Sequence, residues 1–289
     1  CTKINWLKNK YSFTYIPNSQ FFLFKKNKLL NLPKISLAKK SFYLGVGNPN
    51  LSKERDDVKI QKSKKDVKKI TSMLRGNNFV SQTGEITNLY ENVLGSEEEL
   101  KQIKQLLKPL KSDLLLGENA NEKNLKLKDL NEYEIIHFAT HGELAGHFEG
   151  KNEPFLVLTP PDIGTEENDG LLTMSEIMNL ENKAKLIILS ACNTASNNIK
   201  EAEGFTGLAR AFLYAGSSSV MVSNWYVETI SAKDLTTNMI KFLKENKNIS
   251  FSKALTLSMN KISTEKERSH PFYWAPFVIV GLGDSIKFN

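Results

Sequence analysis

Two segments of the chain place a residue capable of covalent or acid–base chemistry directly after an apolar run. Residues 135–142 read IIHFATHG and end in His141-Gly142, and residues 186–193 read LIILSACN and contain Cys192. A cysteine thiolate attacks a carbonyl carbon, and a histidine imidazole takes up the thiol proton or protonates the leaving amine. His141 and Cys192 together therefore predict a catalytic dyad for acyl transfer.

The backbone beside these two residues has a predicted role as well. Gly142 carries no Cβ, so a substrate can approach its backbone closely. We expect the backbone N–H groups of Gly142 and Cys192 to stabilise the oxyanion that develops during attack.

The elements that position the dyad alternate between short apolar runs and helical patterns. We predict strands at 13–16, 41–46, 112–116, 134–139, 155–158, 186–189, 219–222 and 277–280, and helices at 57–74, 97–110, 119–130, 173–179, 205–215, 231–246 and 250–262. Apolar runs without polar alternation indicate strands covered on both faces. The alternation predicts an α/β sandwich with a mainly parallel central sheet, and functional residues gather past the carboxyl ends of such strands.

The charge of the chain is distributed unevenly. Residues 1–40 contain nine Lys and no acidic residue, while the remainder has 30 basic and 32 acidic residues. We interpret residues 1–40 as a basic N-terminal segment that joins a region upstream, and residues 41–289 as one domain. A basic segment can attract nucleic acid. However, only four of the 39 basic residues are Arg, which favours a solvated Lys surface over nucleic-acid binding.

Composition narrows the remaining function classes. The chain has only two cysteines, Cys1 and Cys192, and no apolar run of 18 residues. We therefore expect no disulfide framework, no membrane span and a cytoplasmic location. Because the first residue is not Met, we expect the chain to be part of a longer protein or a processed product.

A metal site is the alternative use of the histidines. His137, His141 and His147 could join Cys192 around zinc. The spacing lacks the glutamate of His-Glu-x-x-His, and no second cysteine is near. We expect no metal and no cofactor, with His137 as a hydrogen-bonded core residue and His147 in a loop.

Taken in order, the motifs resemble the CHAT domain family. The segments that carry the resemblance are HFATHG (137–142), DGLLT (169–173), LSACNT (189–194), GF (204–205) with LARAFLYAG (208–216), and HPFYWAPF (270–277), preceded by GVGNP (45–49) and LGENA (116–120). The resemblance covers roughly residues 11–283. The 51-residue separation of His141 and Cys192 is also similar to the spacing of about 50 in caspases.

The resemblance implies a caspase-like fold, a three-layer sandwich related to separase and the gingipains. It implies a cysteine endopeptidase with His141 and Cys192 as the dyad and a protein as substrate. Family members often follow tetratricopeptide repeats or other sensor modules. An upstream repeat region or a regulatory partner is therefore expected to gate the activity.

One segment departs from the family pattern. Many members have LWPVDD where residues 224–229 of this chain read NWYVET. An acid here lines the pocket for a basic P1 side chain in separase-like relatives. Glu228 could bind Arg or Lys in this way, or it could be an exposed loop residue. Trp225 could form a wall of the same pocket or pack on the core.

Cys192, Arg210 and the domain as a whole each allow a second interpretation. Cys192 could be an inert buried cysteine, although a His-Gly pair at another strand end favours catalysis. The domain could be a catalytically silent scaffold or signalling module. Arg210 could pair with a buried acid or shape the site.

Overall fold

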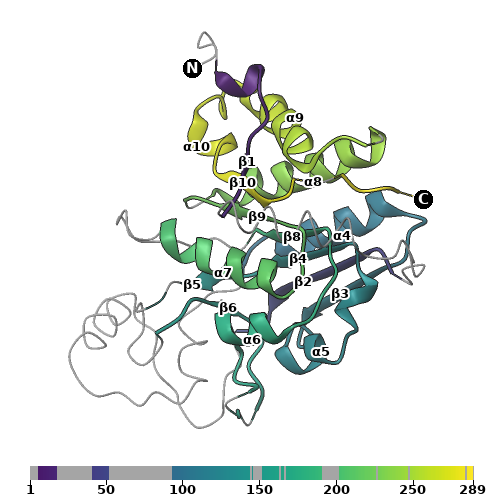
Figure 1. Cartoon of the computed structure of the whole chain (residues 1–289), viewed down its shortest axis with the longest axis vertical. Coiled ribbons are helices and arrows are strands. Elements are labelled where there is room, and N and C mark those ends of the chain that lie inside the picture. Colours follow the sequence, from purple (N-terminus) through teal and green to yellow (C-terminus); the bar gives the residue numbers. More distant parts are fainter. Residues whose placement is uncertain are drawn as a thin grey trace, which may run out of the picture.

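The computed structural model describes residues 6–17, 41–51, 93–143, 145, 152–162, 164–165, 167–190, 202–225, 227–246, 248–283 and 285–288, with backbone only at 202–206. Its centre is a seven-stranded sheet in the order β1-β10-β9-β8-β4-β2-β3 (Figure 1). The strands are β1 (Thr14–Tyr15), β2 (Tyr43–Pro49), β3 (Ser112–Gly117), β4 (Ile135–Ala139), β8 (Leu186–Leu189), β9 (Ser219–Ser223) and β10 (Phe277–Gly281).

The sheet is mainly parallel, as the alternation of strands and helices predicts. β3, β2, β4, β8 and β9 run in one direction. β10 pairs antiparallel with β9, and β1 pairs parallel with β10. The basic N-terminal segment thus contributes the edge strand β1, beside the 3-10 helix η1 (Leu7–Asn9).

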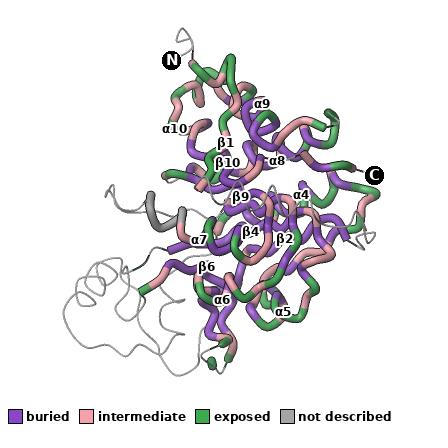
Figure 2. The backbone as a smooth tube through the Cα atoms, viewed as in Figure 1, coloured by how far each residue is buried: buried purple, intermediate pink, exposed green. Residues whose placement is uncertain are grey.

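Helices cover both faces of the sheet, so the chain is a three-layer sandwich (Figure 1). The helices are α4 (Ser96–Leu107), α5 (Glu122–Lys126), α6 (Met174–Asn179), α7 (Ala202–Tyr214), α8 (Thr229–Glu245), α9 (Phe251–Ser263) and α10 (Pro271–Trp274), with a short 3-10 helix η2 (Leu130–Glu132) before β4. One apolar core joins α5, α6 and α7 to the sheet. The other joins α4, α8 and α9 to the opposite face. The central strands β2, β4, β8 and β9, between the two cores, are almost entirely buried (Figure 2).

The burial of β4 shows how one strand serves both cores. Ile136 and Phe138 pack in the α6–α7 core, while Ile135 and Ala139 pack in the α4–α8 core. Side chains alternate across a strand, which directs His137 into the α4–α8 layer.

A second sheet of three antiparallel strands follows β4. It consists of β5 (Gly142–Glu143), β6 (Phe155–Val157) and β7 (Leu171–Thr173). The strand expected at 155–158 is therefore real but belongs to this small sheet. The helix start predicted at Thr173 is confirmed, and Thr173 and Glu176 form the capping box that begins α6.

The strand expected at 41–46 extends further than its sequence indicates. β2 continues through the glycine-rich segment 45–49 to Pro49. A Cβ on Gly47 would lie 2.5 Å from the backbone oxygen of Ala139 and 2.8 Å from Leu100. Glycine here permits close packing of β2 against β4 and α4. The helix expected at 57–74 lies outside the described residues.

Candidate functional site

The carboxyl ends of β4, β8 and β9 lie side by side in the sheet. β4 pairs with β8 at a constant offset of 51 residues, from Ile135↔Leu186 to Phe138↔Leu189. β8 pairs with β9 at an offset of 33, with Ile188 opposite Met221. The two strands that lead to His141 and Cys192 are therefore nearest neighbours.

His141 and Gly142 link the end of β4 to the small sheet. His141 is buried, with 8% of its surface exposed. Its carbonyl oxygen accepts a hydrogen bond from the N–H of Val157, at 2.8 Å. Along an antiparallel pair of strands, residue pairs that exchange backbone hydrogen bonds alternate with residue pairs that do not. Gly142, opposite Leu156, is therefore at a non-bonded pair, and its N–H points away from β6.

Part of the predicted site is not described. Cys192 and His147 lie outside the described residues. The dyad and the backbone donor at Cys192 therefore stay predictions. The described chain carries the segment up to Ser190, whose N–H donates to the carbonyl oxygen of Phe138 at 3.0 Å.

Trp225 lies two residues beyond the end of β9. Its indole Nε1–H donates to the carbonyl oxygen of Phe272 in α10, at 3.2 Å. Its own carbonyl oxygen accepts from the hydroxyl of Ser223 at 3.0 Å. These two bonds fix the ring beside α10 at the carboxyl edge of the sheet.

Glu228 is the N-cap residue of α8. Its Oε2 accepts from the backbone N–H of Ser231 at 3.0 Å and from the hydroxyl of Ser231 at 2.7 Å. A carboxylate at a helix N-terminus satisfies a free N–H and is favoured by the helix dipole. The structure thus gives Glu228 a capping role, and its contact with a substrate stays a prediction.

His137 is a hydrogen-bonded core residue, as expected, and it organises a buried polar cluster. Its Nδ1 lies 3.1 Å from the hydroxyl of Tyr43, and its Nε2 lies 2.8 Å from Oγ of Ser190 and 3.2 Å from Oε1 of Glu99. The same Glu99 oxygen accepts from the hydroxyl of Thr236 at 2.6 Å. Tyr43, His137 and Thr236 are completely buried, and Glu99 is 4% exposed.

Sequence reasoning missed Glu99, although a signal was present. Glu99, Ile103 and Leu107 are spaced by four residues and share the buried face of α4. Helix positions four apart lie on one face. A carboxylate on an apolar face indicates a buried partner.

The cluster resembles a Ser-His-Glu triad in composition but not in geometry. In a triad the serine and the acid bond to opposite nitrogens of the imidazole. Here Ser190 and Glu99 both lie on Nε2, and Tyr43 occupies Nδ1. This geometry excludes activation of Ser190 as a nucleophile by Glu99 through the ring.

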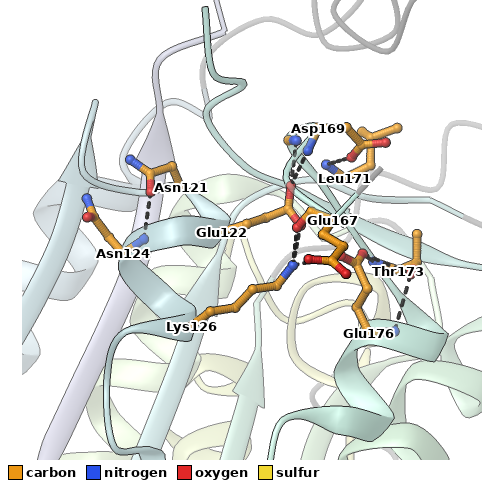
Figure 3. A network of polar contacts seen from close by, with 10 residues as sticks. Asn121, Glu122, Asn124, Lys126, Glu167, Asp169, Leu171, Thr173 and Glu176 are labelled. Atoms are coloured by element: carbon orange, nitrogen blue, oxygen red, sulfur yellow. Dashed lines mark hydrogen bonds and ion pairs between the residues drawn. The ribbon is translucent and has the colours of Figure 1, made fainter. Parts of the chain in front are cut away.

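A second polar cluster lies beneath the DGLLT segment (Figure 3). Oε2 of Glu122 accepts the backbone N–H groups of Asp169 and Gly170, at 2.8 and 2.6 Å. Lys126 lies between Glu122 and Glu176, at 3.1 and 2.7 Å. The side chain of Glu122 has no exposed surface, so this carboxylate fixes the turn that leads into β7 and α6.

Burial sets the ionisation of this cluster. It raises the pKa of Glu122 to about 7, with the charge of Glu176 adding to the effect. Burial also acts to raise the pKa of Glu176, but hydrogen bonds from Lys126 and Thr173 bring that pKa below its ordinary value. One carboxyl of the pair is therefore held ionised and the other takes up a proton near neutral pH.

This arrangement makes stability depend on pH. The pKa of Glu122 lies above its ordinary value of 4.5 in the folded chain, so the folded state binds the proton more tightly. Glu122 therefore contributes on the order of 3 kcal/mol to the free energy of unfolding below pH 4.5, and this contribution is lost as the pH rises through 7. Urea unfolding of wild type and Glu122→Gln between pH 4 and 8 measures this. A stability difference that does not change with pH would contradict the assignment.

Other polar residues of the sequence have simpler places. Arg210 is exposed on α7. His270 caps α10, its Nδ1 accepting from the N–H of Phe272 at 3.2 Å. Within the described residues, no three His, Cys, Asp or Glu side chains converge as metal ligands. None of the described helices has the length and apolar character to cross a membrane.

Known proteins share this sequence pattern. The family model of the CHAT domain matches residues 2–282. Tetratricopeptide repeat protein 28 of Homo sapiens is 27% identical over 221 residues, which cover 67% of this chain and 8% of that protein. Its Mus musculus counterpart is 26% identical and is covered to 9%. The chain thus spans less than a tenth of these curated relatives.

The fold has solved counterparts. Separase in the Saccharomyces cerevisiae separase–securin complex aligns over 84% of this chain and 12% of its own, at 16% identity and a TM-score of 0.43. The Arg-specific cysteine proteinase gingipain R aligns with a TM-score of 0.50 and 10% identity, covering 89% of this chain and 49% of that one. The gingipain match confirms the expected caspase-like fold.

Proposed function

Because this chain belongs to the CHAT domain family, we propose that it is a cysteine endopeptidase that cleaves a protein with His141 and Cys192. The observation that carries the proposal is an equality of two offsets. β4 pairs with β8 at an offset of 51, and His141 and Cys192 are also 51 residues apart. His141 and Cys192 therefore lie the same number of residues beyond the last residue pair of β4 and β8. Neighbouring parallel strands lie about 4.8 Å apart.

The proposed reaction balances without a cofactor. The Cys192 thiolate forms a bond to the scissile carbonyl carbon, while His141 holds the thiol proton. The C–N bond breaks as His141 donates that proton to the leaving amine. Water then hydrolyses the thioester, which releases the carboxylic acid and restores the thiol.

The backbone supports the oxyanion in this scheme. The N–H of Gly142 points away from β6 because Gly142 is at a non-bonded pair of the ladder. Together with the N–H of Cys192 it would bind the negative oxygen of the tetrahedral intermediate.

Covalent labelling tests the proposal. A peptidyl acyloxymethyl ketone is expected to label the activated protein at Cys192 and to leave Cys192→Ala unlabelled. Cys1→Ser is the matched control, because it removes the other cysteine and should label as the wild type does. Equal labelling of wild type and Cys192→Ala would overturn the proposal in favour of a catalytically silent scaffold.

We further propose that an upstream repeat region or a regulatory partner gates the activity in the cytoplasm. The support is that the matched curated relatives are named for tetratricopeptide repeats and extend far beyond the matched region. Expression of the full open reading frame with and without any upstream repeats tests this. Identical labelling rates for both proteins would contradict gating.

The substrate pocket gives a separate prediction at Glu228. Serine is a good N-cap residue, so Glu228→Ser should retain the cap of α8 while removing the charge. If Glu228 binds a basic P1 side chain, this variant loses about 10-fold or more in kcat/KM for Arg or Lys peptides, with an unchanged melting temperature. Glu228→Ala is the comparison, because it should also lose about 1 kcal/mol of stability. Unchanged P1 preference in Glu228→Ser would leave Glu228 with a capping role alone.

A further inference from the structure

The structure assigns a positioning function to the buried cluster around His137: it fixes Ser190 and thereby the chain that leads, two residues later, to Cys192. This inference rests on the proposed function of Cys192. It adds Glu99, His137 and Ser190 to the machinery of that site, none of which is expected to touch the substrate.

The hydrogen bonds of the cluster define where its protons lie. Ser190 Oγ lies 3.3 Å from the carbonyl oxygen of Phe138 and can donate to it, so its lone pairs accept from Nε2–H of His137 at 2.8 Å. The same Nε2–H faces the Glu99 carboxylate at 3.2 Å. One imidazole proton therefore serves both the serine and the carboxylate.

Tyr43 completes the arrangement on the other nitrogen. Burial, together with the charge of Glu99, raises the pKa of the Tyr43 hydroxyl well above its ordinary value. Tyr43 thus keeps its proton and donates it to Nδ1 of His137, at 3.1 Å. The donors and acceptors of the ring are then all used, which fixes the orientation of the ring.

The elements that meet in the cluster explain why it can position the site. Glu99 comes from α4, Thr236 from α8, Tyr43 from β2 and His137 from β4. All four are buried. Ser190 is the one member that lies past the end of its strand, β8, and it is partly exposed. The cluster therefore ties the partly exposed residue that follows β8 to four buried residues on four other elements.

Three hydrogen bonds converge on Ser190 as a result. Its backbone N–H and its hydroxyl donate to the carbonyl oxygen of Phe138, at 3.0 and 3.3 Å, and its hydroxyl accepts from His137. Loss of the hydroxyl leaves only the backbone bond. A displacement of about 1 Å near reacting groups can lower a rate by about 100-fold, so we expect the loss to reach the reactivity of Cys192.

The test measures alkylation of Cys192 by iodoacetamide as a function of pH, in a Cys1→Ser background. A cysteine paired with an imidazole has a lowered thiol pKa, and an unpaired one titrates near 8.5. Ser190→Ala is expected to shift the midpoint of the profile upward by about one unit, which lowers the rate by up to about 10-fold at pH values below the wild-type midpoint. Ser190→Thr retains the hydroxyl and should retain at least about a third of the rate.

A matched control separates positioning from general stability. Ser258 is a buried serine, and its hydroxyl donates to the carbonyl oxygen of Leu235 at 2.8 Å in the α8–α9 layer. Ser258→Ala should lose stability similar to Ser190→Ala without moving the alkylation profile. Glu99→Gln should move the profile in the same direction as Ser190→Ala, and the double variant should move it no further, because both act through His137.

Hydrogen exchange gives a readout that does not depend on catalysis. The amide of residue 190 should exchange about fivefold faster in Ser190→Ala than in Ser258→Ala. This ratio corresponds to the loss of one ordinary hydrogen bond. Equal exchange in these two variants would overturn the inference. So would faster exchange with an alkylation profile that matches the control.

The same experiment separates the two proposals. If His141→Ala changes the alkylation profile and Ser190→Ala does not, the positioning inference fails and the dyad stands. If neither changes it, the proposed dyad fails, and with it the role of the cluster in catalysis.

Discussion

Replacing His141 by alanine is expected to lower the alkylation rate of Cys192 at pH 6 by about 100-fold, measured with iodoacetamide in a Cys1→Ser background. The physical reason is the thiolate fraction. A thiol paired with an imidazole is ionised at pH 6, whereas an isolated thiol with a pKa near 8.5 is less than about 1% ionised. The midpoint of the pH profile should therefore move from the acidic range to that of a free cysteine.

Turnover should fall further than alkylation does. Loss of a general base and acid typically lowers catalysis by about 100-fold to 10,000-fold. His141 also provides the proton for the leaving amine, which alkylation does not require. Once a cleaved peptide is identified, kcat for His141→Ala should fall by about 1000-fold or more, and KM should change much less than kcat does.

His270→Asn is the matched control for this prediction. It removes another imidazole of the same chain, and asparagine is a good N-cap residue that can replace the cap His270 gives α10. The control should alkylate as the wild type does. An alkylation profile that is the same in wild type and His141→Ala would contradict a dyad.

The two strand ends were predictable because local pattern and tertiary position coincide there. The runs before His141 and Cys192 are apolar on both faces, which identifies interior parallel strands, and the carboxyl ends of such strands share one edge of the sheet. The adjacency of β4 and β8 was not predictable. It follows from the strand order of the sheet, which depends on pairing between distant segments.

Other parts of the site depend on contacts that no local pattern encodes. Glu228 lies in a segment where the family resemblance implies a substrate pocket, and its carboxylate caps α8. The short strands β5 and β7 have too few residues for a period to be visible, and they exist because they pair with β6. His137 is predictable as a hydrogen-bonded core residue, whereas its partners Tyr43, Glu99 and Ser190 lie on segments far away in the sequence.

The second large effect is expected at Gly216, in the turn between α7 and β9. Its φ is +125°, a conformation that favours glycine. A Cβ at this position would lie 2.0 Å from the backbone oxygen of Asn182. The N–H of Asn182 in turn donates to the carbonyl oxygen of Ala215 at 3.0 Å. The turn before β9 is thus packed backbone to backbone against the turn before β8.

Gly216→Ala should therefore lower the free energy of unfolding by about 3 to 5 kcal/mol, because it adds backbone strain to a contact that cannot be relieved by moving a side chain. Gly117→Ala is the matched control. Gly117 also has a positive φ, +54°, but nothing lies within 4 Å of the position that an added Cβ would take. The control should lose about 1 kcal/mol, the cost of the left-handed conformation alone.

Urea unfolding monitored by circular dichroism measures both variants. Equal losses would mean that the turn relaxes away from Asn182, and would contradict rigid contact between the two turns. A large loss at Gly216 alone has a consequence for the site. The turns at Asn182 and Gly216 start β8 and β9, the strands that lead to Ser190 and Trp225. The close contact at one edge of the sheet would then support the alignment of the strand ends at the other.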